Sequence, residues 1–118
     1  MDNETSDLRT RTKLFARRII RLYCKLPKDT VAQVLGKQVL RSGTSIGANY
    51  REACRARSKA EFTSKMGDCL KEADEMLYWL ELLVEEKVVS QRKLSALLAE
   101  ADELVAIFVS SINTSRSG

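Results

Sequence analysis

The stretch SKAEFTSKMGDCLKEADEMLYWLELLVEEK, residues 58–87, decides the fold. Its apolar positions follow one another at alternating intervals of four and three residues: Phe62, Met66, Cys69, Ala73, Met76, Leu80 and Leu83. This heptad-like spacing places all seven side chains on one face of an α-helix. Ser58 and Glu61 have the spacing of a capping box, which marks where a helix begins. We therefore predict a helix over residues 58–87 with one apolar face.

Three other segments show the same helical spacing of apolar residues. The first covers residues 8–26, and Pro27 ends it because a proline disfavours helical geometry in the residue before it. The second covers residues 30–55, after Asp29 and Thr30, which are suitable N-caps. The last covers residues 90–113, with Ser90 as its cap. The chain therefore has four amphipathic helices.

The second of these helices contains the run SGTSIGAN, residues 42–49. Small polar residues favour turns over helices, so propensity alone would break the helix near Gly43. Yet Ser42, Ser45, Asn49 and Ala53 continue the stripe at spacings of three and four. Small residues in such a row allow a neighbouring helix to approach closely. We predict one long helix, with a kink at Gly43 as the open alternative.

Four such helices with short connections predict an all-α, antiparallel, up-and-down four-helix bundle. The chain has 118 residues, one proline and five glycines, which fits a single domain over residues 1–118. No apolar run approaches the ~20 residues that a membrane span needs. Since the first residues are acidic and polar, unlike a secretory signal, we expect a cytoplasmic protein that does not enter membranes.

The composition argues against catalysis. Histidine is absent, which removes the commonest general base and metal ligand. The three cysteines, Cys24, Cys54 and Cys69, are widely spaced and form no metal-ligand pair. No glycine-rich phosphate-binding motif occurs. We expect no enzymatic activity, no metal and no cofactor.

The charge of the chain is divided unevenly between its halves. Residues 1–60 have fourteen Lys and Arg against five Asp and Glu, whereas residues 61–118 have six against eleven. This asymmetry favours a polyanion-binding face, charge-complementary packing, or both. The residues that we predict to bind nucleic acid are Arg11, Arg17, Arg18, Arg21, Lys25, Arg51, Arg55, Arg57 and Lys59.

Two functions remain open for this basic surface. It can hold the backbone of RNA or DNA, in a salt-sensitive and sequence-independent way. Alternatively, it docks an acidic partner protein, and the chain is a structural or protein-interaction module. The interleaved aromatic residues Phe15 and Tyr23 lie on the apolar stripe, so base stacking is not supported.

Two further groups of residues stand out. Polar residues on the second and third helices predict a buried hydrogen-bonded network, in which Arg41 pairs with Glu72 or Glu75; its members are Gln38, Arg41, Asn49, Glu52, Glu72 and Glu75. A pocket for a ligand or partner is the alternative function of these residues. The segment 77–84 is apolar nearly all round the helix, which exceeds what one bundle buries. We predict that Tyr78, Trp79 and Leu82 form an interface in a homo-oligomer.

Residues 38–86 also resemble a known family. The family pattern Q-x-x-R-[SA]-x-x-S-I-x-x-N-x-x-E, followed by [KR]-S-x-x-[ED]-F and an acidic, leucine-rich segment, is matched by Gln38, Arg41, Ser42, Ser45, Ile46, Asn49, Glu52, Arg57, Ser58, Glu61, Phe62, Glu72 and Glu75. The chain thus resembles the four-helix-bundle proteins encoded in intervening sequences of large-subunit ribosomal RNA genes.

The resemblance implies a homopentameric barrel and no known catalytic activity. A distant relative of the family, the accessory variability protein of diversity-generating retroelements, binds nucleic acid and a reverse transcriptase through a basic surface. This sequence does not look close to that branch, so the resemblance suggests only a mode of action, that of a basic oligomeric binding protein.

Overall fold

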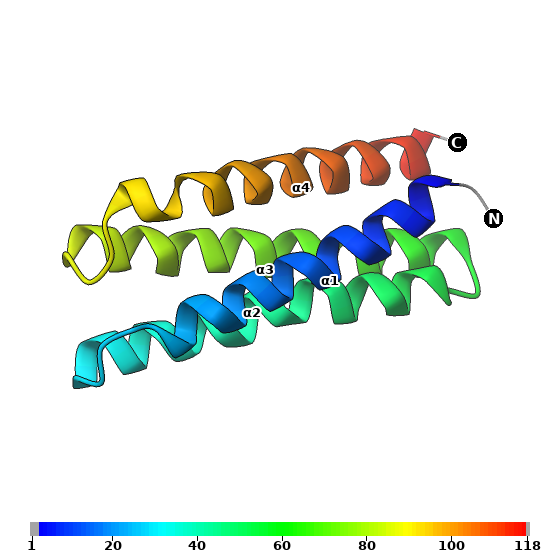
Figure 1. The fold of residues 1–118 in the computed structure, drawn as a ribbon. Coiled ribbons are helices and arrows are strands. Elements are labelled where there is room, and N and C mark those ends of the chain that lie inside the picture. Colours follow the sequence, from blue (N-terminus) through cyan, green and yellow to red (C-terminus); the bar gives the residue numbers. More distant parts are fainter. Residues whose placement is uncertain (1–2, 118) are drawn as a thin grey trace.

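The computed structural model describes the backbone of residues 3–117 and the side chains of residues 7–117. Four helices make up this part of the chain: α1 Asn3–Cys24, α2 Thr30–Cys54, α3 Lys59–Glu85 and α4 Gln91–Ser117. Consecutive helices run in opposite directions, and residues 3–117 contain no strand (Figure 1). The predicted all-α, antiparallel four-helix arrangement is confirmed.

Side-chain caps fix where three of the helices begin. Asp29 accepts a hydrogen bond from the Ala32 amide at 3.0 Å, at the start of α2. Ser58 accepts one from the Glu61 amide at 3.0 Å before α3. Ser90 does the same for the Lys93 amide at 3.3 Å before α4. Each cap satisfies an amide that has no partner within its helix.

The predicted helix boundaries differ from the observed ones mainly at the ends of the chain. The first helix starts at Asn3, five residues before the predicted position, and ends at Cys24. The last helix continues through the polar tail to Ser117, beyond the predicted end at residue 113. Both extensions consist of polar residues, which carry no apolar periodicity.

The core forms along the predicted face of α3. Met66, Cys69, Ala73, Met76, Leu80 and Leu83 are all fully buried, and Phe62 is half-buried. Burying a large side chain such as Leu80 or Met76 stabilises the fold by about 1.5–3 kcal/mol. Helix α3 packs against α2 and α4, and α2 also packs against α1. Of the neighbouring pairs, α1 and α4 pack least closely.

Helix α2 is unbroken from Thr30 to Cys54, so it passes through Gly43 as one helix. A Cβ atom at Gly43 would lie 2.8 Å from Cγ1 of Ile19 on α1. The glycine is therefore required by the close approach of α1, although the sequence suggests Gly43 only as a possible kink. The buried stripe of α2 nevertheless differs from prediction: it contains Ile46 and Tyr50, while Ser45 and Asn49 are only half-buried.

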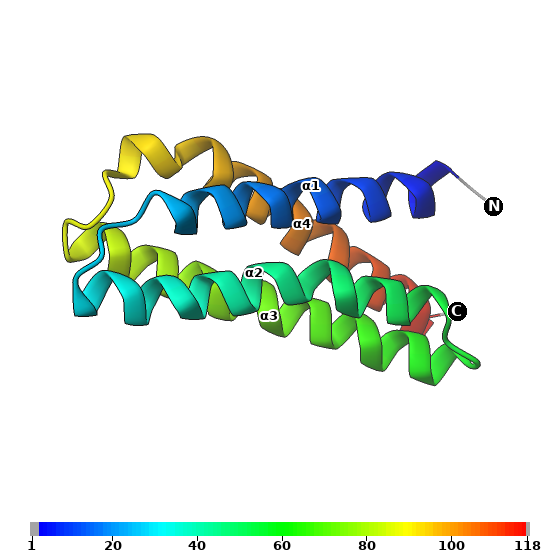
Figure 2. The same ribbon diagram turned by 60° about the horizontal axis from the view of Figure 1, so that its bottom comes forward.

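The bundle is elongated, with extents of 47 × 22 × 19 Å. The α1–α2 and α3–α4 connections lie at one end, and the α2–α3 connection lies at the other end with the two termini of the chain (Figures 1 and 2). The last turns of α1 therefore lie at the same end of the bundle as the first turns of α4 (Figure 1).

Candidate nucleic-acid interface

Four cationic side chains line a hollow between α1 and α2. Arg9, Lys13 and Arg17 follow one another at intervals of four residues on α1, and Arg51 faces them from α2. The hollow has a volume of about 360 Å³, and no acidic side chain of residues 7–117 lines it. We call this site the basic hollow. Cations grouped in this way can hold phosphate oxygens.

Close packing of α1 on α2 brings Arg51 to this place. Gly47, one turn before Arg51, lies so near α1 that a Cβ atom there would be 3.2 Å from the Thr12 hydroxyl oxygen. Thr12 itself is buried, and its hydroxyl donates to the Leu8 carbonyl oxygen at 2.8 Å. A small residue on α2 therefore allows the cations of two helices to share one surface.

The predicted basic residues at the α2–α3 junction extend this surface. Arg55, Arg57 and Lys59 are exposed, and their connection lies at the same end of the bundle as the first turns of α1 (Figure 1). Arg9 and Lys13 were not among the predicted residues, although they precede Arg17 at intervals of four residues, which is a usable signal.

Arg11 was predicted to bind nucleic acid, but it is occupied by contacts within the chain. Its guanidinium donates two hydrogen bonds to Glu100 of α4, at 3.1 and 2.7 Å, and one to Glu103 at 3.3 Å. Its side chain is 24% exposed. The hydrogen bond with Glu100 is the main cause that raises the pKa of Arg11 above its usual range. Arg11 joins α1 to α4 and is removed from the candidate interface.

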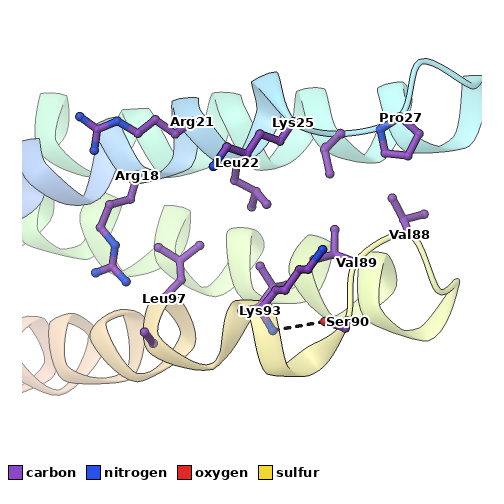
Figure 3. Close-up of a pocket in the computed structure, with 13 residues that line it drawn as sticks. Arg18, Arg21, Leu22, Lys25, Pro27, Val88, Val89, Ser90, Lys93 and Leu97 are labelled. Carbon is purple, nitrogen blue, oxygen red and sulfur yellow. Dashed lines mark hydrogen bonds between the residues drawn. The ribbon is translucent and has the colours of Figure 1, made fainter.

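The other predicted cations of α1 line a different surface. Arg18, Arg21 and Lys25 border a groove between α1 and α4, together with Lys93 of α4, which the sequence analysis did not single out. Figure 3 shows Leu22 directed from α1 into this space and Arg18 extended toward α4. We call this site the amphipathic groove, because its lining combines cations with apolar residues.

The predicted polar network is only partly present. Arg41 donates to Glu72 at 3.3 Å, to Glu75 at 3.1 Å and to Gln38 at 3.3 Å. The predicted burial is wrong, since the Arg41 side chain is 49% exposed. Placing these polar groups at the helix edge avoids the cost of desolvating charges.

The two other members of the predicted network lie apart from this cluster. Glu52 is exposed and pairs with Lys65 at 2.8 Å, and this hydrogen bond raises the pKa of Lys65. Asn49 is half-buried and belongs to neither group.

The predicted interface residues lie side by side on α3. Tyr78 is 55% exposed, while Trp79 and Leu82 are half-buried. The rings of Tyr78 and Trp79 meet edge to face, with centroids 5.1 Å apart. The Trp79 indole Nε1 is buried and has no hydrogen-bond partner within the described residues.

Two exposed valines of α2 accompany these residues. Val31 and Val34 are 52% and 56% exposed. Helices α2 and α3 are antiparallel, and Arg41 of α2 lies beside Glu72 and Glu75 of α3 (Figure 1). Val34 is two turns before Arg41, and Trp79 and Leu82 are two turns after the glutamates. Val34 therefore lies at the level of Trp79 and Leu82.

The described residues offer neither a metal site nor a membrane-spanning helix. Among the side chains of residues 7–117, no group of three or more Cys, Asp or Glu residues is arranged to hold a metal ion. None of the helices in residues 3–117 combines the length and apolar character that crossing a membrane requires.

Comparison with known proteins identifies close relatives. The sequence profile of the family described as 23S rRNA-intervening sequence protein matches residues 4–110. A crystal structure of a protein of unknown function from the S23 ribosomal protein family of Bacteroides thetaiotaomicron is 38% identical, with a TM-score of 0.86, over 92% of this chain and 97% of that chain. A comparison with curated proteins found no match.

Proposed function

The chain belongs to the 23S rRNA-intervening sequence protein family, and we propose that it is a non-enzymatic, oligomeric protein that binds the backbone of RNA or DNA. The proposal concerns the basic hollow and the junction residues Arg55, Arg57 and Lys59. The family is named for ribosomal RNA, which makes RNA the first polymer to test.

The observation that carries this proposal is the grouping of cations in the basic hollow. Arg9, Lys13, Arg17 and Arg51 come from two helices, and none of them forms an ion pair within the described residues. A solvated helix face would interleave such residues with acids, as occurs on α1 where Arg11 lies 3.9 Å from Asp7, one turn away. Four unpaired cations around one hollow are suited to an extended polyanion.

The aromatic residues support backbone contacts over base reading. Phe15 is 1% exposed, so its ring is unavailable for stacking. Tyr23 is half-buried, and its hydroxyl is hydrogen-bonded to Gln33 at 2.7 Å. Because stacking on aromatic rings is how single-stranded bases are commonly held, we expect binding that depends little on sequence.

Self-association is the second part of the proposal. Helices α2 and α3 expose three large apolar side chains, each more than half accessible to solvent: Val31, Val34 and Tyr78. Exposed apolar side chains that lie near one another often mark a protein–protein interface. On the family resemblance we propose five subunits. Light scattering at micromolar protein concentration should give the mass of an oligomer, and the mass of a single chain would contradict this part.

We also propose a cytoplasmic location, because Cys24, Cys54 and Cys69 are free thiols, as is usual in reducing compartments.

Charge reversal tests the nucleic-acid proposal. We expect Arg17→Glu/Arg51→Glu to lose binding to labelled RNA and duplex DNA at low salt. A matched control, Lys37→Glu/Lys71→Glu, changes the net charge equally at exposed positions on α2 and α3. The control should keep most of the binding. Equal losses in the two variants would show that total charge matters and the basic hollow does not.

A further inference from the structure

The amphipathic groove has the character of half an interface. It has a volume of about 490 Å³ and lies between the last turns of α1 and the first turns of α4. Its floor contains Leu22, which is only half-buried, and its border holds cations from both helices (Figure 3). No acidic residue lines it, and none of these cations forms an ion pair within the described residues; they are Arg18, Arg21, Lys25 and Lys93.

A surface of opposite charge lies on α3 of the same chain. Asp74, Tyr78, Glu81 and Glu85 are all exposed and follow one another at intervals of four, three and four residues, with the half-buried Leu82 beside them. We call this stripe the α3 ridge. None of its three acids forms an ion pair within the described residues. The ridge thus combines an exposed aromatic ring with unpaired carboxylates.

The groove and the ridge match in level and length. Both lie toward the end of the bundle that holds the α1–α2 and α3–α4 connections (Figures 1 and 2). The cations of α1 from Arg18 to Lys25 are seven positions apart, as are Tyr78 and Glu85 in the C-terminal part of the ridge. At 1.5 Å per residue each stretch is about 10 Å long. Two copies standing side by side can therefore bring the two surfaces together.

We propose that the α3 ridge of one copy of this chain lies in the amphipathic groove of the next copy. Tyr78 and Leu82 pack on the apolar floor, and Glu81 and Glu85 face the cations at its border. An amphipathic helix that lays its apolar residues into a groove is a common mode of recognition. Opposite charges around the contact fix which surfaces pair and in which register.

The proposal rests on the self-association proposed above and names its interface. Each copy has one groove and one ridge, on different helices, so the contact is head to tail. Head-to-tail contacts generate closed rings when the rotation between copies closes. The basic first half of the chain would then contact the acidic second half of the next copy. The basic hollow is not part of this contact and stays accessible to a polyanion.

Two charge-reversal variants test this interface. Arg21→Glu/Lys25→Glu reverses the groove, and Glu81→Lys/Glu85→Lys reverses the ridge. All four residues are exposed, so both variants should keep the helical circular-dichroism spectrum of the wild type. We expect each variant alone to sediment as a single chain where the wild type is an oligomer. The control Lys37→Glu/Lys71→Glu should remain assembled.

Combining all four changes in one chain gives the sharpest readout. Every copy then has an acidic groove and a basic ridge, so each contact in a ring of five is again between opposite charges and the chain should assemble. Two-residue variants that stay assembled, or a four-change chain that stays dissociated, would overturn the proposed interface. A wild-type protein that is itself a single chain would instead overturn the proposed self-association.

Discussion

Arg11 of α1 and Glu100 of α4 are joined by two parallel hydrogen bonds, Nε to Oε2 at 3.1 Å and Nη2 to Oε1 at 2.7 Å. Both side chains are more than three-quarters buried, with exposed fractions of 24% and 20%. The pair connects the two neighbouring helices that pack least closely. Two-bond guanidinium–carboxylate pairs are among the stronger polar contacts in proteins.

The first prediction follows from this pair. Arg11→Ala leaves the Glu100 carboxylate partly buried without its main partner, so we expect the free energy of unfolding to fall by about 1–3 kcal/mol. The measurement is urea denaturation followed by circular dichroism. Arg17→Ala is the matched control, because Arg17 is exposed and unpaired, and it should change stability by less than about 0.5 kcal/mol. Equal effects would mean that the Arg11 pair contributes nothing special.

Arg41 should behave differently from Arg11, although it also contacts two glutamates. Its side chain is 49% exposed, and ion pairs at the surface contribute about 0–1 kcal/mol. We therefore expect Arg41→Ala to lower the free energy of unfolding by no more than about 1 kcal/mol. A loss of about 3–5 kcal/mol in the same denaturation experiment would indicate a buried pair, against the observed geometry.

Two glycines in helices should respond in opposite directions to alanine. At Gly43 the new Cβ atom would lie 2.8 Å from Ile19 Cγ1, a contact that forces a shift in the core. We expect Gly43→Ala to destabilise by about 1–3 kcal/mol, partly offset by better helix propensity. At Gly67 nothing lies within 4 Å of the new atom, so Gly67→Ala should stabilise by about 0.5–1 kcal/mol. The measurement is the thermal midpoint of unfolding. If both variants changed it in the same direction relative to the wild type, the close approach of α1 at Gly43 would be contradicted.

The cysteines should differ in reactivity. Burial raises the pKa of Cys69 from 9.0 to about 12, and its thiol contacts the Ile46 carbonyl oxygen at 3.7 Å. Cys24 is exposed. At neutral pH iodoacetamide should label Cys24 in the folded protein and Cys69 only after denaturation, as peptide mass spectrometry can show. Rapid labelling of Cys69 in the native protein would indicate that the core opens.

The raised pKa of Cys69 also predicts a pH dependence of stability. The folded state holds the thiol proton more tightly than the unfolded state, so this contribution is complete below pH 9 and is lost between pH 9 and about 12.

The sequence was sufficient for the four helices because their evidence is local. The apolar spacing of Met66 to Leu83 and the caps Asp29, Ser58 and Ser90 depend on a few neighbouring residues each. The polar ends of α1 and α4 lack that spacing, so their extent was underestimated. The buried stripe of α2 was misjudged because Ser45 and Asn49 have the same spacing as Ile46 and Tyr50, one residue further along, so both rows fit a helical stripe.

The candidate site was harder to predict because it depends on the register between helices. Arg11 and Arg18 fall on one face of α1, yet Arg11 meets Glu100, which is 89 positions away, and Arg18 borders the amphipathic groove. The spacing of residues within one helix does not predict which α4 residue faces which α1 residue. In the same way, Arg51 joins Lys13 and Arg17 only because Gly47 allows α1 to approach.

The central claim, that the basic hollow binds the phosphate backbone, is tested most directly by the salt dependence of duplex DNA affinity. We expect the wild type to bind tightly near ~50 mM salt and to weaken steeply as salt rises, with close to one unit of log–log slope per phosphate contact. Arg17→Gln should reduce that slope by about one unit for each hollow engaged, whereas Lys37→Gln should leave it unchanged. No binding of the wild type to either RNA or duplex DNA near ~50 mM salt would contradict the claim, and docking of an acidic protein would become the leading function.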